Sequence, residues 1–182
     1  MKRPSKSFEI ALSAIACAVA ALALTLGSYV DVMLAAGYII AVYALMVPLS
    51  KEFVWGNALA FVGAALLAFL FCGFAFIRLV PFVMFLGLHP LINFLQKKYV
   101  KKLPLHFLAY LGKALWFDGM LLFCWFILAP IFGVAEQSWY PFIQQYLYYL
   151  VFIGGTVIFA AYDYLIFLCQ RSVNAAVRRI RR

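Results

Sequence analysis

Residues 9–29 read EIALSAIACAVAALALTLGSY, an apolar run whose one charged residue is its first. A membrane-spanning helix needs about 20 mainly apolar residues, so this run is long enough to cross a bilayer. It is too long for the hydrophobic core of a signal peptide, and further apolar runs follow it. We therefore expect it to remain in place as the first transmembrane helix.

The composition of the whole chain excludes several classes of protein. Of the 182 residues, 68% are hydrophobic and 12% are charged, against about half and a quarter in soluble domains. A soluble domain must cover its surface with polar groups, which excludes a soluble enzyme and a disordered tail. The net charge of +9 would indicate nucleic acid in a soluble chain. Here we interpret it as a sign of membrane topology and expect no nucleic-acid partner.

Hydropathy predicts an all-α integral membrane protein, with residues 1–182 forming a single transmembrane domain of six helices. The predicted spans are 9–29, 33–50, 53–77, 79–96, 104–131 and 142–169. The second and fourth are short or interrupted, by Pro48 in one and by Pro81 and Pro90 in the other. Proline removes a backbone hydrogen bond and bends a helix, and irregular backbone inside a membrane can line a cavity.

The distribution of positive charge predicts the orientation of these spans. In a six-span arrangement, thirteen of the fifteen Lys and Arg residues fall on one side and Arg78 alone on the other, while Lys113 lies within a span. Positive residues are concentrated on the cytoplasmic side of membrane proteins. We therefore expect a multi-pass protein of the cytoplasmic membrane with both termini in the cytoplasm. The loops are too short for a nucleotide-binding module, so an ATP-driven step would need another chain.

Three charged residues lie well away from the ends of the predicted spans, where a charge costs roughly 2.5–3.5 kcal/mol on insertion scales. Lys113 and Asp163 occupy similar depths in the fifth and sixth spans. We expect a structural ion pair between them, with a proton relay or a ligand contact as the alternative. Asp118 is five residues from Lys113, about 140° around the helix, so the two cannot share a face. Asp118 is therefore a candidate for substrate binding or for a structural hydrogen bond.

The outer half of the spans holds further polar and aromatic residues. Arg78 begins the fourth span, on the side where positive charge is rare, and could pair with Asp31 or Glu136. In the sixth span, one predicted stripe contains Gln145, Tyr149, Phe152, Thr156 and Asp163. An aromatic wall with a few polar groups suits a small amphipathic ligand, and an interfacial aromatic belt is the alternative. The candidate substrate-binding residues are Arg78, Asp118, Gln145, Tyr149 and Thr156.

No catalytic or metal-binding pattern accompanies these residues. There is no GxSxG, no HExxH and no matching pair of carboxylate motifs, so we expect no enzyme. His89, which precedes Pro90, is interpreted as a satisfied buried polar group, with a role as a ligand as the alternative. The four cysteines lie in separate apolar runs without a CxxC pair. We interpret them as small buried side chains and expect no metal and no cofactor.

Two stripes of small residues complete the pattern. The first span carries Ala14-x-x-x-Ala18 and Ala16-x-x-x-Ala20. The third span carries small residues four apart, at Gly56, Ala60, Ala64, Ala68 and Cys72. Such stripes let helices approach closely in a bilayer, where no hydrophobic effect drives them together. They indicate either packing within this chain or docking on a partner membrane protein.

Six spans in about 180 residues, cytoplasmic termini, an alanine-rich first helix with Ala14-x-x-x-Ala18 and no attached motor together resemble the S-components of energy-coupling factor (ECF) transporters. These are substrate-capture subunits for vitamins and related micronutrients. The resemblance implies that Ala14 and Ala18, and less surely Ala16 and Ala20, contact a transmembrane coupling subunit driven by cytoplasmic ATPases. It implies a small-molecule ligand held near the outer face. The metal-transporting branch uses an N-terminal histidine, whereas residue 2 here is lysine, which argues against nickel or cobalt.

A second interpretation stays open, namely a non-transporting membrane scaffold such as the MreD-like proteins of cell-envelope assembly. These have a similar size and number of spans. A scaffold requires partner-binding faces but no closed ligand pocket, whereas a capture subunit requires both.

Overall fold

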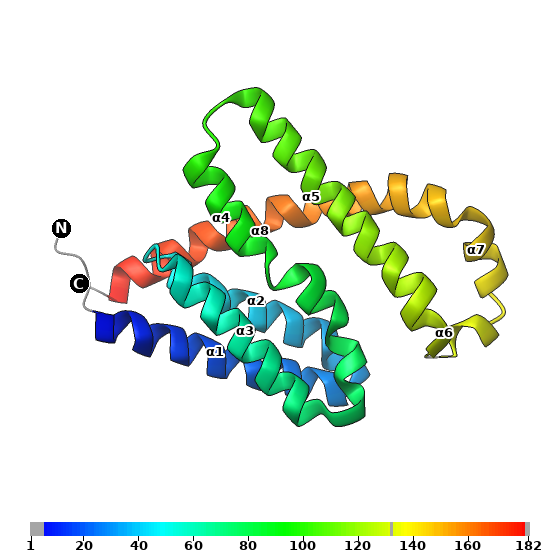
Figure 1. The fold of residues 1–182 in the computed structure, drawn as a ribbon, viewed down its shortest axis with the longest axis horizontal. Coiled ribbons are helices and arrows are strands. Elements are labelled where there is room, and N and C mark those ends of the chain that lie inside the picture. The colour runs from blue at the N-terminus through cyan, green and yellow to red at the C-terminus, as the bar shows by residue number, and fades with distance from the viewer. Residues whose placement is uncertain (1–5, 132, 181–182) are drawn as a thin grey trace. The chain divides into compact units, whose positions relative to one another are not determined.

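The computed structural model describes residues 6–131 and 133–180, apart from the side chains of residues 31, 74 and 178–180. It is 92% helical, and no strand occurs in that part of the chain (Figure 1). The α-helices are α1 (Lys6–Tyr29), α2 (Leu34–Leu49), α3 (Val54–Cys72), α4 (His89–Tyr99), α5 (Leu103–Phe123), α6 (Ala129–Ile131), α7 (Tyr140–Tyr149) and α8 (Thr156–Ile180).

Shorter helical turns connect several of these helices. The 3-10 turns are Asp31–Met33, Gly73–Leu79 and Val134–Glu136. The π-helical turns, whose hydrogen bonds reach five residues along the chain, are Phe82–Leu86, Cys124–Leu128 and Leu150–Gly155.

Five helical segments in the described residues are long and apolar enough to cross a membrane. They are Lys6–Tyr29, Val54–Cys72, Ala75–Tyr99, Leu103–Ile131 and Tyr140–Val177. The length and apolar composition of these helices indicate a multi-pass membrane-embedded protein. The second predicted span corresponds to the shorter apolar helix α2, which at 1.5 Å per residue is shorter than the hydrocarbon core of about 30 Å. A sixth span and the orientation of the termini therefore stay predictions, and Lys2, Arg3, Arg181 and Arg182 lie outside the described residues.

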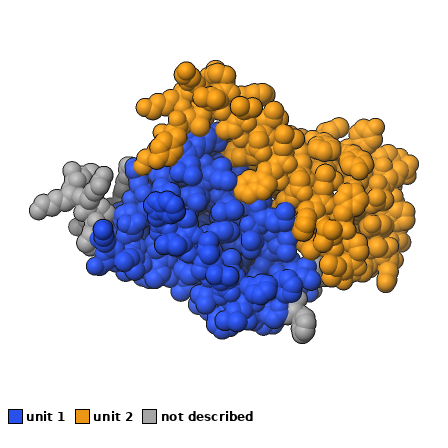
Figure 2. All heavy atoms as spheres, viewed as in Figure 1, with its two compact units in different colours: residues 1–97, 166–182 blue, residues 98–165 orange. Residues whose placement is uncertain are grey.

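The chain divides into two compact units, which Figure 2 shows in blue and orange. The first unit contains residues 1–97 and 166–182, and the second contains residues 98–165. The boundaries fall in the lysine-rich loop before α5 and within α8.

In the first unit, α1 packs along both α2 and α3 (Figure 1). Ser13 of α1 lies against Gly56 of α3, and further along both helices the Ser28 hydroxyl is 2.9 Å from the Cys72 thiol. The two helices therefore run parallel. Every member of the small-residue stripe on α3, from Gly56 to Cys72, is buried. This stripe packs within the chain, which is one of the two roles that the sequence left open for it.

The contact between α1 and α2 depends on two glycines at the end where the chain turns back. A Cβ atom on Gly37 would lie 2.6 Å from the carbonyl oxygen of Ala23 and 3.2 Å from Cα of Gly27. Only glycine at residue 37 allows the two backbones to come this close. The absence of side chains here lets the helices gain dispersion contacts along their length.

Side-chain amides from two other helices contact the backbone at the end of α2. Pro48 lies in its last turn and lacks a backbone donor. Asn57 of α3 donates from Nδ2 to the carbonyl oxygen of Leu45 at 2.5 Å, and Gln170 of α8 donates from Nε2 to that of Met46 at 3.3 Å. These bonds tie α3 and the C-terminal half of α8 to α2.

The backbone between α3 and α4 is irregular, in the region where the sequence predicted interruption by Pro81 and Pro90. The predicted third span reached residue 77, but α3 ends at Cys72 because Gly73 has a φ of +53°. Such a backbone conformation strongly favours glycine and stops a helix. Phe82, in the π turn that follows Pro81, is fully buried. Its ring lies 6.0 Å from that of Tyr38 and 6.1 Å from that of Phe61.

In the second unit, α5 and the segment from α7 into α8 form an antiparallel helical hairpin. Side-chain contacts join Lys113 to Asp163, Asp118 to Thr156 and Trp125 to Gln144. From Lys113 to Trp125 the residue numbers rise along the first arm of the hairpin, while the numbers of the residues that they contact on the other arm fall. The two arms are therefore antiparallel.

Two π turns interrupt this hairpin, and each has a local cause. The turn Cys124–Leu128 precedes Pro130, whose ring would clash with a carbonyl in a regular helix. The turn Leu150–Gly155 ends in two glycines, Gly154 and Gly155. A π turn contains more residues than an α-helical turn, so it rotates the side chains that follow it around the helix axis. Residues before position 150 and after position 155 therefore do not lie on the face that a regular 3.6-residue repeat predicts. The last helix also continues to Ile180, beyond the predicted end at residue 169.

Candidate functional site

The alanines of α1 divide between a buried and an exposed face. Ala16 and Ala20 are buried, whereas Ala14 and Ala18 are exposed. Ala11 is exposed on the same side of the helix as Ala14 and Ala18. Thus one small-xxx-small pair packs within the chain, and the pair that the resemblance associates with a coupling subunit lies on the surface.

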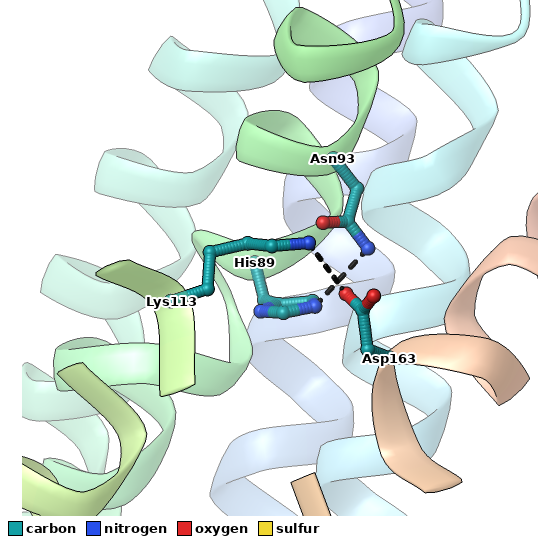
Figure 3. Close-up of polar contacts among 4 residues, drawn as sticks. All are labelled: His89, Asn93, Lys113 and Asp163. Atoms are coloured by element: carbon teal, nitrogen blue, oxygen red, sulfur yellow. Dashed lines mark hydrogen bonds and ion pairs between the residues drawn. The ribbon is translucent and has the colours of Figure 1, made fainter. Parts of the chain in front are cut away.

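Lys113 and Asp163 form a buried ion pair in the second unit, as their depths in the two spans predict (Figure 3). The Nζ atom of Lys113 is 2.7 Å from Oδ1 of Asp163, and the two side chains are 4% and 9% exposed. Nζ also lies 6.0 Å from the ring centres of Tyr110 and Phe159. A short bond and two aromatic rings compensate the cost of removing the ammonium group from water.

Asp118 lies on α5 and faces the π turn that leads into α8. Its side chain is 2% exposed. Oδ2 lies 3.4 Å from Oγ1 of Thr156, while Oδ1 has no hydrogen-bond partner. A Cβ atom on Gly155 would lie 2.8 Å from Oδ1, so this glycine allows the carboxyl group to approach the helix backbone. The structure therefore brings Asp118 and Thr156 together, as two of the five candidate substrate-binding residues.

Gln145 and Tyr149 occupy a different environment from Asp118. Both are exposed, and Tyr149 is 69% exposed. The predicted stripe from Gln145 to Asp163 assumed a regular helix, and the π turn Leu150–Gly155 interrupts that helix between Tyr149 and Thr156. Their role in ligand binding stays a prediction.

Arg78, the remaining candidate, belongs to the first unit and contacts the end of α1. Its Nη1 donates to the carbonyl oxygen of Ser28 at 3.1 Å. The Tyr38 hydroxyl donates to the carbonyl oxygen of Arg78. The last carbonyls of a helix lack partners and carry partial negative charge. A guanidinium group at this position therefore stabilises α1. The side chain of Asp31 lies outside the described residues.

His89 and Asn93 form a buried polar pair on α4 (Figure 3). Their side-chain nitrogens, Nε2 and Nδ2, are 3.1 Å apart, and the His89 ring lies 4.7 Å from that of Phe85. The Nε2 atom of His89 therefore has a polar partner within α4. Within residues 6–131 and 133–180, no three His, Cys, Asp or Glu side chains are grouped so that they could hold a metal ion.

An aromatic cluster at the turn of the hairpin was not selected from the sequence as a unit. Trp125 stacks on Tyr140 with ring centres 4.9 Å apart and planes 7° apart, and Trp139 lies 6.5 Å away. The indole nitrogen of Trp125 donates to Oε1 of Gln144 at 2.5 Å. The pairing of Trp139 and Tyr140 with Trp125 follows from the hairpin register.

No protein-family model, curated protein or solved structure matches this chain.

Proposed function

We propose that this protein is a membrane-embedded substrate-binding subunit of a multi-component importer for a vitamin-like micronutrient. It captures a small molecule from the outer face and docks on a separate ATP-driven coupling module. The observation that supports this proposal is the exposed position of Ala14 and Ala18 on α1.

The physical argument concerns what an exposed alanine does in a bilayer. Helix association in lipid depends on close backbone approach, because burying apolar surface gains little when the solvent is itself apolar. Ala16 and Ala20 already serve the packing of α1 within the chain. The small side chains at Ala14 and Ala18 are not used for that packing and are available to a second membrane protein.

The residues proposed for ligand recognition stay those predicted from the sequence, namely Arg78 in the first unit and, in the second unit, Asp118, Gln145, Tyr149 and Thr156. A guanidinium group suits an anionic substituent, and tyrosine suits a planar ring. Both preferences fit a vitamin-like molecule that combines an aromatic ring with an anionic group.

Photo-crosslinking tests the docking step. A photoreactive phenylalanine analogue is placed at Ala14 or Ala18 in native membranes, and Leu66 of α3, which is 64% exposed, is the control. We expect the same membrane protein to be captured from both alanine positions and not from Leu66. Adducts that are equal at all three positions, or absent from the two alanines, would contradict docking through this face.

A second candidate is a non-transporting membrane scaffold of cell-envelope assembly. It is favoured by Arg78, whose guanidinium group and backbone carbonyl both take part in contacts within the first unit. A scaffold would use the same face of α1 but would hold no small molecule. Detection of a bound ligand therefore distinguishes the two candidates.

A further inference from the structure

The carboxyl group of Asp118 has an environment that differs from that of the ion-paired carboxylate of Asp163. It is 2% exposed, its Oδ1 has no hydrogen-bond partner, and this atom lies against the backbone at Gly155. An ionised carboxylate accepts several hydrogen bonds and is costly to bury without them. A neutral carboxylic acid carries its own donor and is far less costly to place inside a membrane.

The hydroxyl group of Thr156 indicates whether Asp118 is a carboxylate or a neutral carboxylic acid. Oγ1 of Thr156 lies 2.7 Å from the carbonyl oxygen of Phe152 and 3.4 Å from Oδ2 of Asp118. A threonine hydroxyl has one proton and two acceptor lone pairs. The shorter contact takes that proton, because the Phe152 carbonyl has none to give. The contact to Asp118 is then best satisfied when the carboxyl group is the donor.

The charged groups of the same hairpin do not compensate a negative charge at Asp118. Lys113 and Asp163, the charged side chains on the facing parts of α5 and α8, are paired with each other at 2.7 Å. Lys113 also projects about 140° away from Asp118 around α5. Within the described part of residues 98–165, the polar side chain that faces Asp118 is the uncharged Thr156.

We infer that Asp118 is a proton-binding site, and that it holds a proton at neutral pH in the membrane. The proton comes from water and converts the carboxylate to the neutral acid. The acid donates to Oγ1 of Thr156, which in turn donates to the carbonyl of Phe152. Gly155 is required because a side chain there would displace Oδ1. This inference does not depend on the identity of a transported substrate or a partner.

Infrared spectroscopy of the full chain in vesicles of ether-linked lipids, which have no ester carbonyls, tests the inference, because a protonated carboxyl group has a C=O band well separated from that of a carboxylate. We expect one such band at neutral pH, with a shift when water is exchanged for D2O. Asp118→Asn removes the band, whereas the matched variant Asp163→Asn retains it. Asparagine has the size and polarity of the neutral acid, and the amide bands of the same spectra report whether each variant keeps its helices.

A second variant keeps the test decisive if Asp118→Asn loses helicity. Thr156→Val removes the acceptor but retains the shape of the side chain, so we expect the protonated band to remain and to move to higher frequency. A wild-type spectrum without the band would overturn the inference. So would a band whose frequency does not change in Thr156→Val, or a band that persists in well-folded Asp118→Asn.

Discussion

The ammonium group of Lys113 lies 2.7 Å from Oδ1 of Asp163, which is fifty residues further along the chain. The contact fixes the register between α5 and α8. It also explains how two charges are tolerated in segments that are otherwise apolar. Because Lys113 and Asp163 compensate each other, Asp118 is left as a buried ionisable residue of the hairpin that needs a different explanation.

Breaking this pair should destabilise the protein more than removing it altogether. Lys113→Met or Asp163→Asn leaves one buried charge without its partner, at a cost of about 3 kcal/mol. The double variant Lys113→Met with Asp163→Leu leaves no charge and should recover much of that loss. Thermal unfolding in detergent checks this. If the double variant loses the sum of the two single effects, the residues do not act as a pair.

The close approach of α1 and α2 makes Gly37 sensitive to substitution. In Gly37→Ala the new Cβ would meet the Ala23 carbonyl at 2.6 Å, and the helices must separate, at an expected cost of about 2 kcal/mol or more. Gly112→Ala is the matched control, because nothing lies within 4 Å of its Cβ position. There the gain in helix propensity should stabilise the protein by up to about 1 kcal/mol. Equal melting temperatures for the two variants would refute the proposed contact.

The two faces of α1 should respond differently to a larger side chain. Ala20 is 0% exposed, so Ala20→Leu overfills the packing around α1 and should cost about 1–3 kcal/mol. Ala14→Leu lies on the exposed face and should change stability by less than about 0.5 kcal/mol. Melting temperatures of the purified variants check the difference. A large destabilisation by Ala14→Leu would mean that this face also packs within the chain.

Arg78 should behave as a residue that stabilises the end of α1. Arg78→Met removes the donor to the Ser28 carbonyl, and loss of a hydrogen bond from a charged group should cost about 1.5–3 kcal/mol. Hydrogen exchange measured by mass spectrometry should show faster exchange near the end of α1 and unchanged exchange in α5. Unchanged exchange near Ser28 would indicate that the guanidinium group serves another purpose, with ligand binding as the leading alternative.

Hydropathy and charge depth predicted the features of this protein that depend on composition and regular helices. They gave apolar helices close to the observed ones, the contact between Lys113 and Asp163, and an irregular region around Pro81. The small stripe on α3 was also visible, because a four-residue spacing keeps residues on one face of a helix.

Other features depend on backbone geometry that hydropathy does not report. The positive φ of Gly73 ends α3 at Cys72, and the π turn Leu150–Gly155 interrupts the predicted stripe between Tyr149 and Thr156. The sequence also left open which alanines of α1 face inward, since both pairs have the same spacing. The contact of Arg78 with Ser28 depends on how the chain folds back after α3.

Mass spectrometry of the protein as purified in mild detergent, with native lipids and ligands retained, tests the proposed function most directly. Denaturing the sample releases any bound small molecule for identification. The proposal predicts a vitamin-like compound with a charged group, at about one molecule per chain and at a reduced level in Tyr149→Ala. Recovery of lipid alone, from protein whose helices remain intact, would contradict substrate capture and favour the scaffold.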